Sequence, residues 1–289
     1  MYKSLAEIID CVTKKNIAFW KCVQKEDCIE LGISEEEAFS RMQGMYEAMR
    51  SADEGYEDTL YSQSGLVGTD GKKVHDARIK GQLLCGGFIG KVMERAIKMG
   101  ESNACMKRIV AAPTAGSCGV IPAVFLTIQE EKGYTDEQMT EALYVAAGIG
   151  GVIANRAFLA GAAGGCQAEI GSASSMAAGA VAYLMGGDAK VIANAAALAM
   201  KNLLGLACDP VAGLVEVPCV TRNVMGAVNA MTSADLALAG VMSRIPPDEV
   251  FDAMRAIGRA MPENIRETGL GGLAGTPTGV ELREKLTGM

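Results

Sequence analysis

The stretch ALYVAAGIGGVIANRAFLAGAAGG, residues 142–165, decides the fold of this chain, because it carries a single charged side chain, Arg156. A second stretch, VIANAAALAMKNLLG at 191–205, is also apolar on nearly every face. Helices that are apolar all round belong at the centre of a helix bundle. Alternation typical of strands is confined to short runs such as 108–112. The sequence therefore predicts an all-α, multi-helix bundle with central Ala/Gly-rich helices.

Helix-start signals surround this centre. In a capping box, a hydroxyl and a carboxylate or amide three residues later satisfy opposite backbone amides. Three such pairs are present: Ser4 with Glu7, Ser34 with Glu37, and Thr135 with Gln138. Pro247 indicates another helix start, because proline is favoured at the first position of a helix. Apolar residues recur at three and four positions after Ser34 and after Pro247, which indicates amphipathic helices. We expect one domain, 1–289, with outer amphipathic helices in 1–100 and the core in 101–289.

Composition and charge argue against some classes of partner. The chain has 289 residues, 49% of them hydrophobic, and a formal net charge of -7. No basic run is present to neutralise phosphates, so we expect no nucleic-acid partner. The amino terminus lacks the pattern of a signal peptide, which favours the cytoplasm. The charge-free run at 170–187 is too rich in Gly, Ala and Ser to span a membrane, so we expect a buried helix there and no membrane partner.

Two segments are predicted to be surface loops that approach a site, namely 55–80 and the Gly-rich 267–279. The only histidine, His75, falls in the first of them, within KKVHDAR. This residue is either a general base or a solvated loop residue beside Asp76, and its polar surroundings favour the second interpretation. No GxSxG motif accompanies it.

A glycine turn at 112–125, APTAGSCGVIPAVF, precedes an apolar helical run. Gly116 and Gly119 flank Ser117 and Cys118, an arrangement that can direct backbone amides at an anion. The same composition also fits a turn that packs one helix against another.

Nine cysteines without a pairing pattern indicate reduced thiols. We expect six to be small core residues: Cys11, Cys22, Cys28, Cys85, Cys105 and Cys118. The other three, Cys166, Cys208 and Cys219, lie in breaks rich in Gly or Pro between apolar helices. A metal centre would explain why irregular backbone is buried at these positions. Their spacing matches no zinc-finger pattern, so spacing alone leaves the metal site open.

The motifs APTAGSCGVIPAV, GCQAEIGSASSMAA, GLACDPVAGLVEVPCVTRN and RETGLGGLA together resemble the α chain of the iron-sulfur-dependent L-serine dehydratases. These lyases convert L-serine to pyruvate and ammonia without pyridoxal phosphate, in amino-acid degradation and gluconeogenesis. The resemblance covers most of residues 110–275. It implies that residues 1–289 are one iron-sulfur catalytic domain of a cytoplasmic heteromer.

The resemblance also implies residue roles. A 4Fe-4S cluster would be held by Cys166, Cys208 and Cys219, with one iron left open as a Lewis acid for the serine hydroxyl. The expected substrate-binding residues are Thr114, Gly116, Ser117, Gly119, Ser172, Ser174 and Asn223. The base that removes the α-proton would come from a separate β chain rather than from His75. The alternatives are a non-catalytic iron-sulfur or zinc-stapled helical protein, and a helical module that binds a partner chain without any metal.

Overall fold

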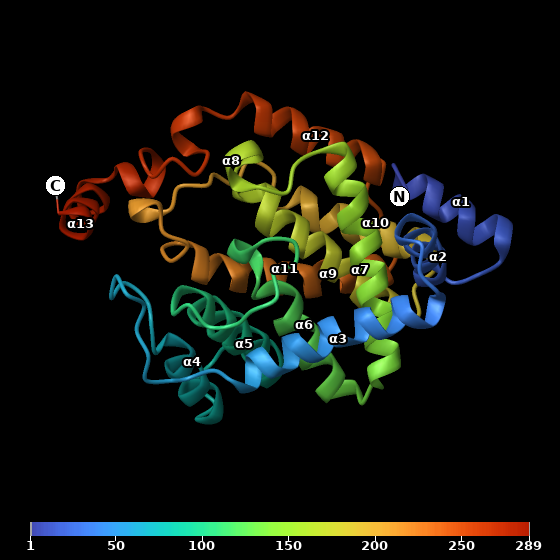
Figure 1. Ribbon diagram of the computed structural model, residues 1–289, viewed down its shortest axis with the longest axis horizontal. Coiled ribbons are helices and arrows are strands. Elements are labelled where there is room, and N and C mark those ends of the chain that lie inside the picture. Colours follow the sequence, from blue (N-terminus) through green and yellow to red (C-terminus); the bar gives the residue numbers. More distant parts are fainter. Residues whose placement is uncertain (1, 289) are drawn as a thin grey trace.

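The computed structural model describes residues 2–288, and within them the fold is all-α, as predicted (Figure 1). No strand forms in this range; the β-type pairing there consists of the isolated bridges Tyr61 with Gly68 and Cys208 with Arg266. The helices are α1 (Leu5–Lys15), α2 (Phe19–Leu31), α3 (Glu35–Glu54), α4 (Asp70–Ile79), α5 (Gly86–Ala104), α6 (Val120–Lys132), α7 (Asp136–Arg156), α8 (Gly161–Gly164), α9 (Ser172–Leu184), α10 (Ala189–Lys201), α11 (Cys219–Leu238), α12 (Pro247–Ala260) and α13 (Pro277–Thr287).

The predicted helix starts are confirmed. The Ser4 hydroxyl accepts a hydrogen bond from the Glu7 amide at 3.1 Å, and Ser34 caps α3 in the same way. At α7 the exchange is reciprocal, because Thr135 Oγ1 accepts from the Gln138 amide while Gln138 Oε1 accepts from the Thr135 amide. These side chains satisfy amides that the first turn of a helix leaves without a partner.

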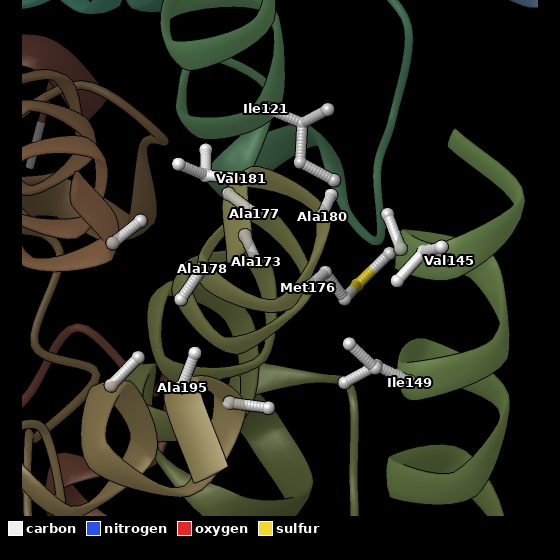
Figure 2. Close-up of a cluster of buried hydrophobic side chains, with 14 of the residues drawn as sticks. Ile121, Val145, Ile149, Ala173, Met176, Ala177, Ala178, Ala180, Val181 and Ala195 are labelled. Atoms are coloured by element: carbon white, nitrogen blue, oxygen red, sulfur yellow. The ribbon is translucent and has the colours of Figure 1, made fainter. Parts of the chain in front are cut away.

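The centre of the bundle is α9, which packs against α6, α7, α10 and α11. Every side chain from Ser172 to Ala182 is buried, which confirms the expected buried helix. Figure 2 shows Ala178 of α9 facing Ala195 of α10, and Met176 reaching toward Val145 and Ile149 of α7. Small side chains allow neighbouring backbones to come close, and the flexible thioether fills the remaining gap.

The outer helices cover this centre from several sides. In Figure 1, α1 and α2 lie near the amino terminus at one end, α13 lies at the other end, and α12 runs along one edge. The helix α5 packs against α4, but also directly against α6 and α11. The helices before residue 100 therefore share the hydrophobic core with the later ones. The assignment of 1–100 and 101–289 to different roles stays a prediction.

The predicted loop at 55–80 is wrong in its second half, where α4 begins at Asp70. Local sequence gave no signal for this helix because its cap comes from a distant residue. Glu101 of α5 accepts hydrogen bonds from the amides of Asp70 and Gly71 at 2.7 and 3.1 Å. His75 consequently lies on a helix rather than in a loop.

The prediction for the six other cysteines holds only in part. Cys11, Cys22 and Cys118 are buried, whereas Cys28 and Cys105 are half-buried and Cys85 is exposed. Cys85 immediately precedes α5 and directs its side chain outward. Among the described residues, no helix combines the length and apolar character needed to cross a membrane.

Candidate functional site

Three buried cysteines lie where helices are interrupted, as the sequence predicts. Cys166 lies between α8 and a single π-turn at Gln167–Gly171, Cys208 follows the end of α10, and Cys219 is the first residue of α11. Their exposed fractions are 2%, 3% and 6%, respectively. The breaks thus bring three thiols into the interior of the bundle.

The Gly-rich carboxyl-terminal segment holds the Cys208 turn in place. The amide of Cys208 donates to the carbonyl of Ile265 at 2.9 Å, and the amide of Glu267 donates to the carbonyl of Cys208 at 2.7 Å. Asp209 Oδ2 accepts a hydrogen bond from the amide of Leu273 at 2.8 Å. The prediction that this segment approaches the site is therefore confirmed.

Arg222 joins the same turn from α11. Its guanidinium donates to the carbonyl of Ala207 at 2.8 Å and lies 2.9 Å from Asp209 Oδ1. Only 5% of Asp209 is exposed, so this pair is largely shielded from water. A buried ion pair of this kind fixes geometry, because removal of one partner leaves a charge unsatisfied.

The three thiols influence one another. Burial raises the pKa of Cys166 to about 12, although attraction to Arg222 acts in the opposite direction. Burial, followed by repulsion from Cys166, raises the pKa of Cys219 to about 12. The pKa of Cys208 is also raised, by burial and then by the negative charges of Cys166 and Glu169. Thiols in this environment carry protons at neutral pH unless a positive group draws the protons off.

Glu169 is a residue of this site that our sequence analysis missed. Its carboxylate is 9% exposed and accepts a hydrogen bond from Thr114 Oγ1 at 2.7 Å, and it lies 3.9 Å from Cys208 Sγ. Burial raises the pKa of this carboxyl. The available signal was its isolation, since Glu169 is the only charged residue between Arg156 and Asp188.

The glycine turn lies against this carboxylate. A Cβ atom on Gly116 would be 2.9 Å from Glu169 Oε1, and one on Gly161 would be 3.0 Å from Glu169 Oε2. Real Cβ atoms do not approach oxygen so closely, so both positions require glycine for the present geometry. The structure thus brings Thr114, Gly116 and Ser117 to Glu169, with Ser117 Oγ 3.1 Å from Thr114 Oγ1.

Asn223 connects this turn to Cys219. Its Nδ2 donates to the carbonyls of Gly116 and Cys219 at 2.9 and 3.0 Å, and its Oδ1 accepts from the amide of Gly119 at 2.8 Å. These bonds use both donors of the side chain and the Gly119 amide. Asn223 and Gly119 therefore position the turn, whereas the amides of Ala115 and Gly116 donate to no acceptor in residues 2–288.

The two predicted serines occupy different surroundings. Ser174 Oγ donates to the carbonyl of Gly226 at 2.8 Å and accepts from Asn229, so it joins α9 to α11. The Ser172 hydroxyl is fully buried and finds no partner among the described residues. The structure gives Ser174 a role in helix packing and leaves the Ser172 hydroxyl unused.

His75 lies apart from the cysteines. Its Nδ1 is 3.0 Å from Glu94 Oε1, within a cluster in which Arg78 and Lys98 also contact Glu94. In Figure 1, α4 is well separated from α8, which leads directly to Cys166. Within residues 2–288, His75 makes no hydrogen bond to any of the three thiols.

The three thiols do not form a site for a single metal ion. Within residues 2–288, no three His, Cys, Asp or Glu side chains are grouped closely enough around one point to hold a single metal ion. The thiols nevertheless act on one another electrostatically.

The fold is thus a helix bundle whose interior holds three thiols, a carboxylate and a glycine turn. Comparison with known proteins identifies the family. The profile of the family described as "Serine dehydratase alpha chain" matches residues 14–274. The chain belongs to this family.

Curated relatives agree with this assignment. The chain is 46% identical over its full length to the probable L-serine dehydratase, alpha chain, of Bacillus subtilis, with 96% of that protein covered. It is 40% identical to the L-serine dehydratase, alpha chain, of Peptoniphilus asaccharolyticus, with 98% of this chain and 97% of that protein covered. The L-serine dehydratase of Helicobacter pylori is 43% identical over 61% of this chain, which corresponds to 39% of that protein.

Proposed function

We propose that this chain is the α chain of a two-chain L-serine dehydratase, a lyase that converts L-serine to pyruvate and ammonia. Its full-length relatives carry that name, and they match it from end to end at 40% and 46% identity. The single observation that carries the proposal is the family match over residues 14–274, which includes the three cysteines, Glu169 and the glycine turn. Serine degradation in the cytoplasm, feeding pyruvate toward gluconeogenesis, is the setting that fits.

The cofactor of the proposed enzyme is a 4Fe-4S cluster on Cys166, Cys208 and Cys219. The proposal rests on three buried thiols that lie at breaks between helices. Bound iron would draw off the protons that burial retains on these thiols. Bound there, the cluster would supply Lewis acidity toward the serine hydroxyl, since three protein ligands leave one of four irons without a protein ligand.

The residues of this chain bind and orient the substrate. The amides of Ala115 and Gly116 suit the serine carboxylate, because they lie at the start of a short helical turn that runs into α6, while the Thr114 hydroxyl donates to Glu169. Asn223 holds the turn that carries these amides beside Cys219, because it donates to the carbonyls of both Gly116 and Cys219. A substrate held by its carboxylate presents its hydroxyl in a fixed direction, which lowers the entropic part of the barrier.

The reaction removes a proton from Cα of serine and hydroxide from Cβ, which gives 2-aminoacrylate and water. The aminoacrylate then tautomerises to the imine, and water hydrolyses the imine to pyruvate and ammonia. A positioned base must take the α-proton. Because His75 is engaged with Glu94 and α4 lies away from α8, the base in this proposal comes from the β chain.

The test is anaerobic purification with iron and sulfide analysis of single Cys→Ser variants. Replacing Cys166, Cys208 or Cys219 should abolish most of the bound iron, because each thiolate binds a different iron. Cys22→Ser, which changes a buried cysteine of α2, is the matched control and should retain wild-type iron. Equal iron in all four variants would overturn the cluster assignment.

A second measurement tests the two-chain arrangement. The cluster-loaded α chain should turn over L-serine very slowly alone and rapidly after addition of the β chain. Full activity of the α chain alone, lost in His75→Ala, would show that the base lies in this chain.

A further inference from the structure

The carboxylate of Glu169 is buried without a cation. Its hydrogen-bond partners in the described chain are the hydroxyl of Thr114 and the thiol of Cys208. Arg222, which acts on Cys166, forms its ion pair with Asp209 instead. A buried carboxylate is costly unless a positive group or several donors balance it. The Glu169 carboxylate can therefore accept further hydrogen bonds from a positively charged group.

Two glycines lie against this carboxylate. A Cβ atom on Gly116 or Gly161 would lie 2.9 or 3.0 Å from one of its oxygens, so either substitution would require the carboxylate to shift. The backbone of Gly116 consequently forms a wall shared by the carboxylate and by the free amide of the turn. An α-amino acid carries its ammonium and its carboxylate on the same carbon, Cα, and so its binding site needs an anion next to an anion-binding turn.

We propose that Glu169 binds the α-ammonium of the substrate, an inference that rests on the proposed function. The amides of Ala115 and Gly116 hold the substrate carboxylate, and Glu169 on the other side of Gly116 holds the ammonium. Thr114 donates to Glu169 Oε1, which leaves the remaining lone pairs for the substrate. The site selects amino acids over hydroxy acids by this contact.

Binding of two inert ligands separates this role from a structural one. L-alanine has the carboxylate and the ammonium of serine but no leaving group, and propanoate lacks the ammonium as well. Calorimetric titration of the anaerobic holoenzyme with each gives a ratio of affinities. In Glu169→Gln the side chain still accepts from Thr114 but loses its charge. We expect the affinity for L-alanine to fall by about tenfold to hundredfold, the effect of losing a charge-assisted hydrogen bond, with propanoate binding unchanged.

Two further variants sharpen the test. Glu169→Asp keeps the charge and should retain part of the preference for L-alanine. Glu101→Gln removes the charge of another buried carboxylate, which is bonded to Tyr56 and to two amides of α4, and should leave the ratio at the wild-type value. Iron content and thermal unfolding of each variant report on folding.

The outcomes distinguish this inference from the proposed function. A Gln variant that loses both ligands equally, or neither, would overturn the ammonium role even if wild-type enzyme dehydrates serine. A wild-type enzyme that prefers L-alanine through Glu169 but leaves serine intact would support the ammonium site and refute the dehydratase function.

Discussion

Replacement of Asn223 by Ala should uncouple the glycine turn from the start of α11. The side chain is 1% exposed and makes three hydrogen bonds, to the carbonyls of Gly116 and Cys219 and from the amide of Gly119. Alanine makes none of them and leaves buried backbone groups of the turn without a partner. A buried polar group without a partner costs more than the net value of the bond it loses.

The size of the effect follows from these bonds. Each contributes about 1 kcal/mol net, and the Cys219 carbonyl counts for less because it also begins the hydrogen-bond ladder of α11. The expected loss of unfolding free energy is about 2 to 3 kcal/mol. For a chain of this size, such a loss lowers the midpoint of thermal unfolding by about 4–12 °C.

The assay combines thermal unfolding with anaerobic iron analysis and the KM for L-serine. The matched control is Asn229→Ala on the same helix, since Asn229 also makes side-chain bonds, to Ser174 and to the carbonyl of Ala199, but not to the glycine turn. Both variants should lose stability, whereas only Asn223→Ala should raise KM and weaken iron retention. Identical KM and iron content in the two variants would refute the positioning role of Asn223.

Three further outcomes are expected. Gly161→Ala places a Cβ atom 2.7 Å from Cys208 Sγ, so iron content should fall, whereas Gly133→Ala, whose Cβ meets no atom within 4 Å, should retain it. His75→Ala should leave kcat for L-serine within about twofold of wild type in the assembled enzyme, since loss of a true general base costs roughly a hundredfold or more. Burial raises the pKa of Glu94, but hydrogen bonds from Lys98, Arg78 and His75 outweigh it and bring the pKa to about 2. This depressed pKa stabilises the fold fully above about pH 5, and the contribution disappears as the pH falls toward 2. Urea unfolding of Glu94→Gln should therefore show lower stability than wild type at pH 7 and a smaller difference at pH 3.

Much of the fold was predictable because its determinants are local. The Thr135 and Gln138 pair caps α7 as the sequence indicates, and the Ala-rich run after Ser172 forms the buried helix α9. The start of α4 was missed because its amides bind Glu101, which is distant in sequence. A helix capped by a distant carboxylate has no local signal for sequence reasoning to detect.

The helix breaks that carry the three cysteines were predictable from the sequence, whereas the side-chain contacts around them were not. Glycines and prolines around Cys166, Cys208 and Cys219 revealed the breaks in the helices. Nothing in the local sequence indicates that Asn223 joins the glycine turn to the start of α11, because this depends on three backbone groups brought together by the fold. Glu169 was overlooked although it is the sole charge in an apolar region.

The crossing of residues 265–273 over Cys208 and Asp209 has a consequence for the order in which the molecule is completed. A ribosome releases the central helices α6 to α11 well before it releases this segment. The turn that carries Cys208 therefore lacks its backbone partners until residues 265–273 have been made. The hydrogen bonds around Cys208 and Asp209 form after the helices on either side of this turn.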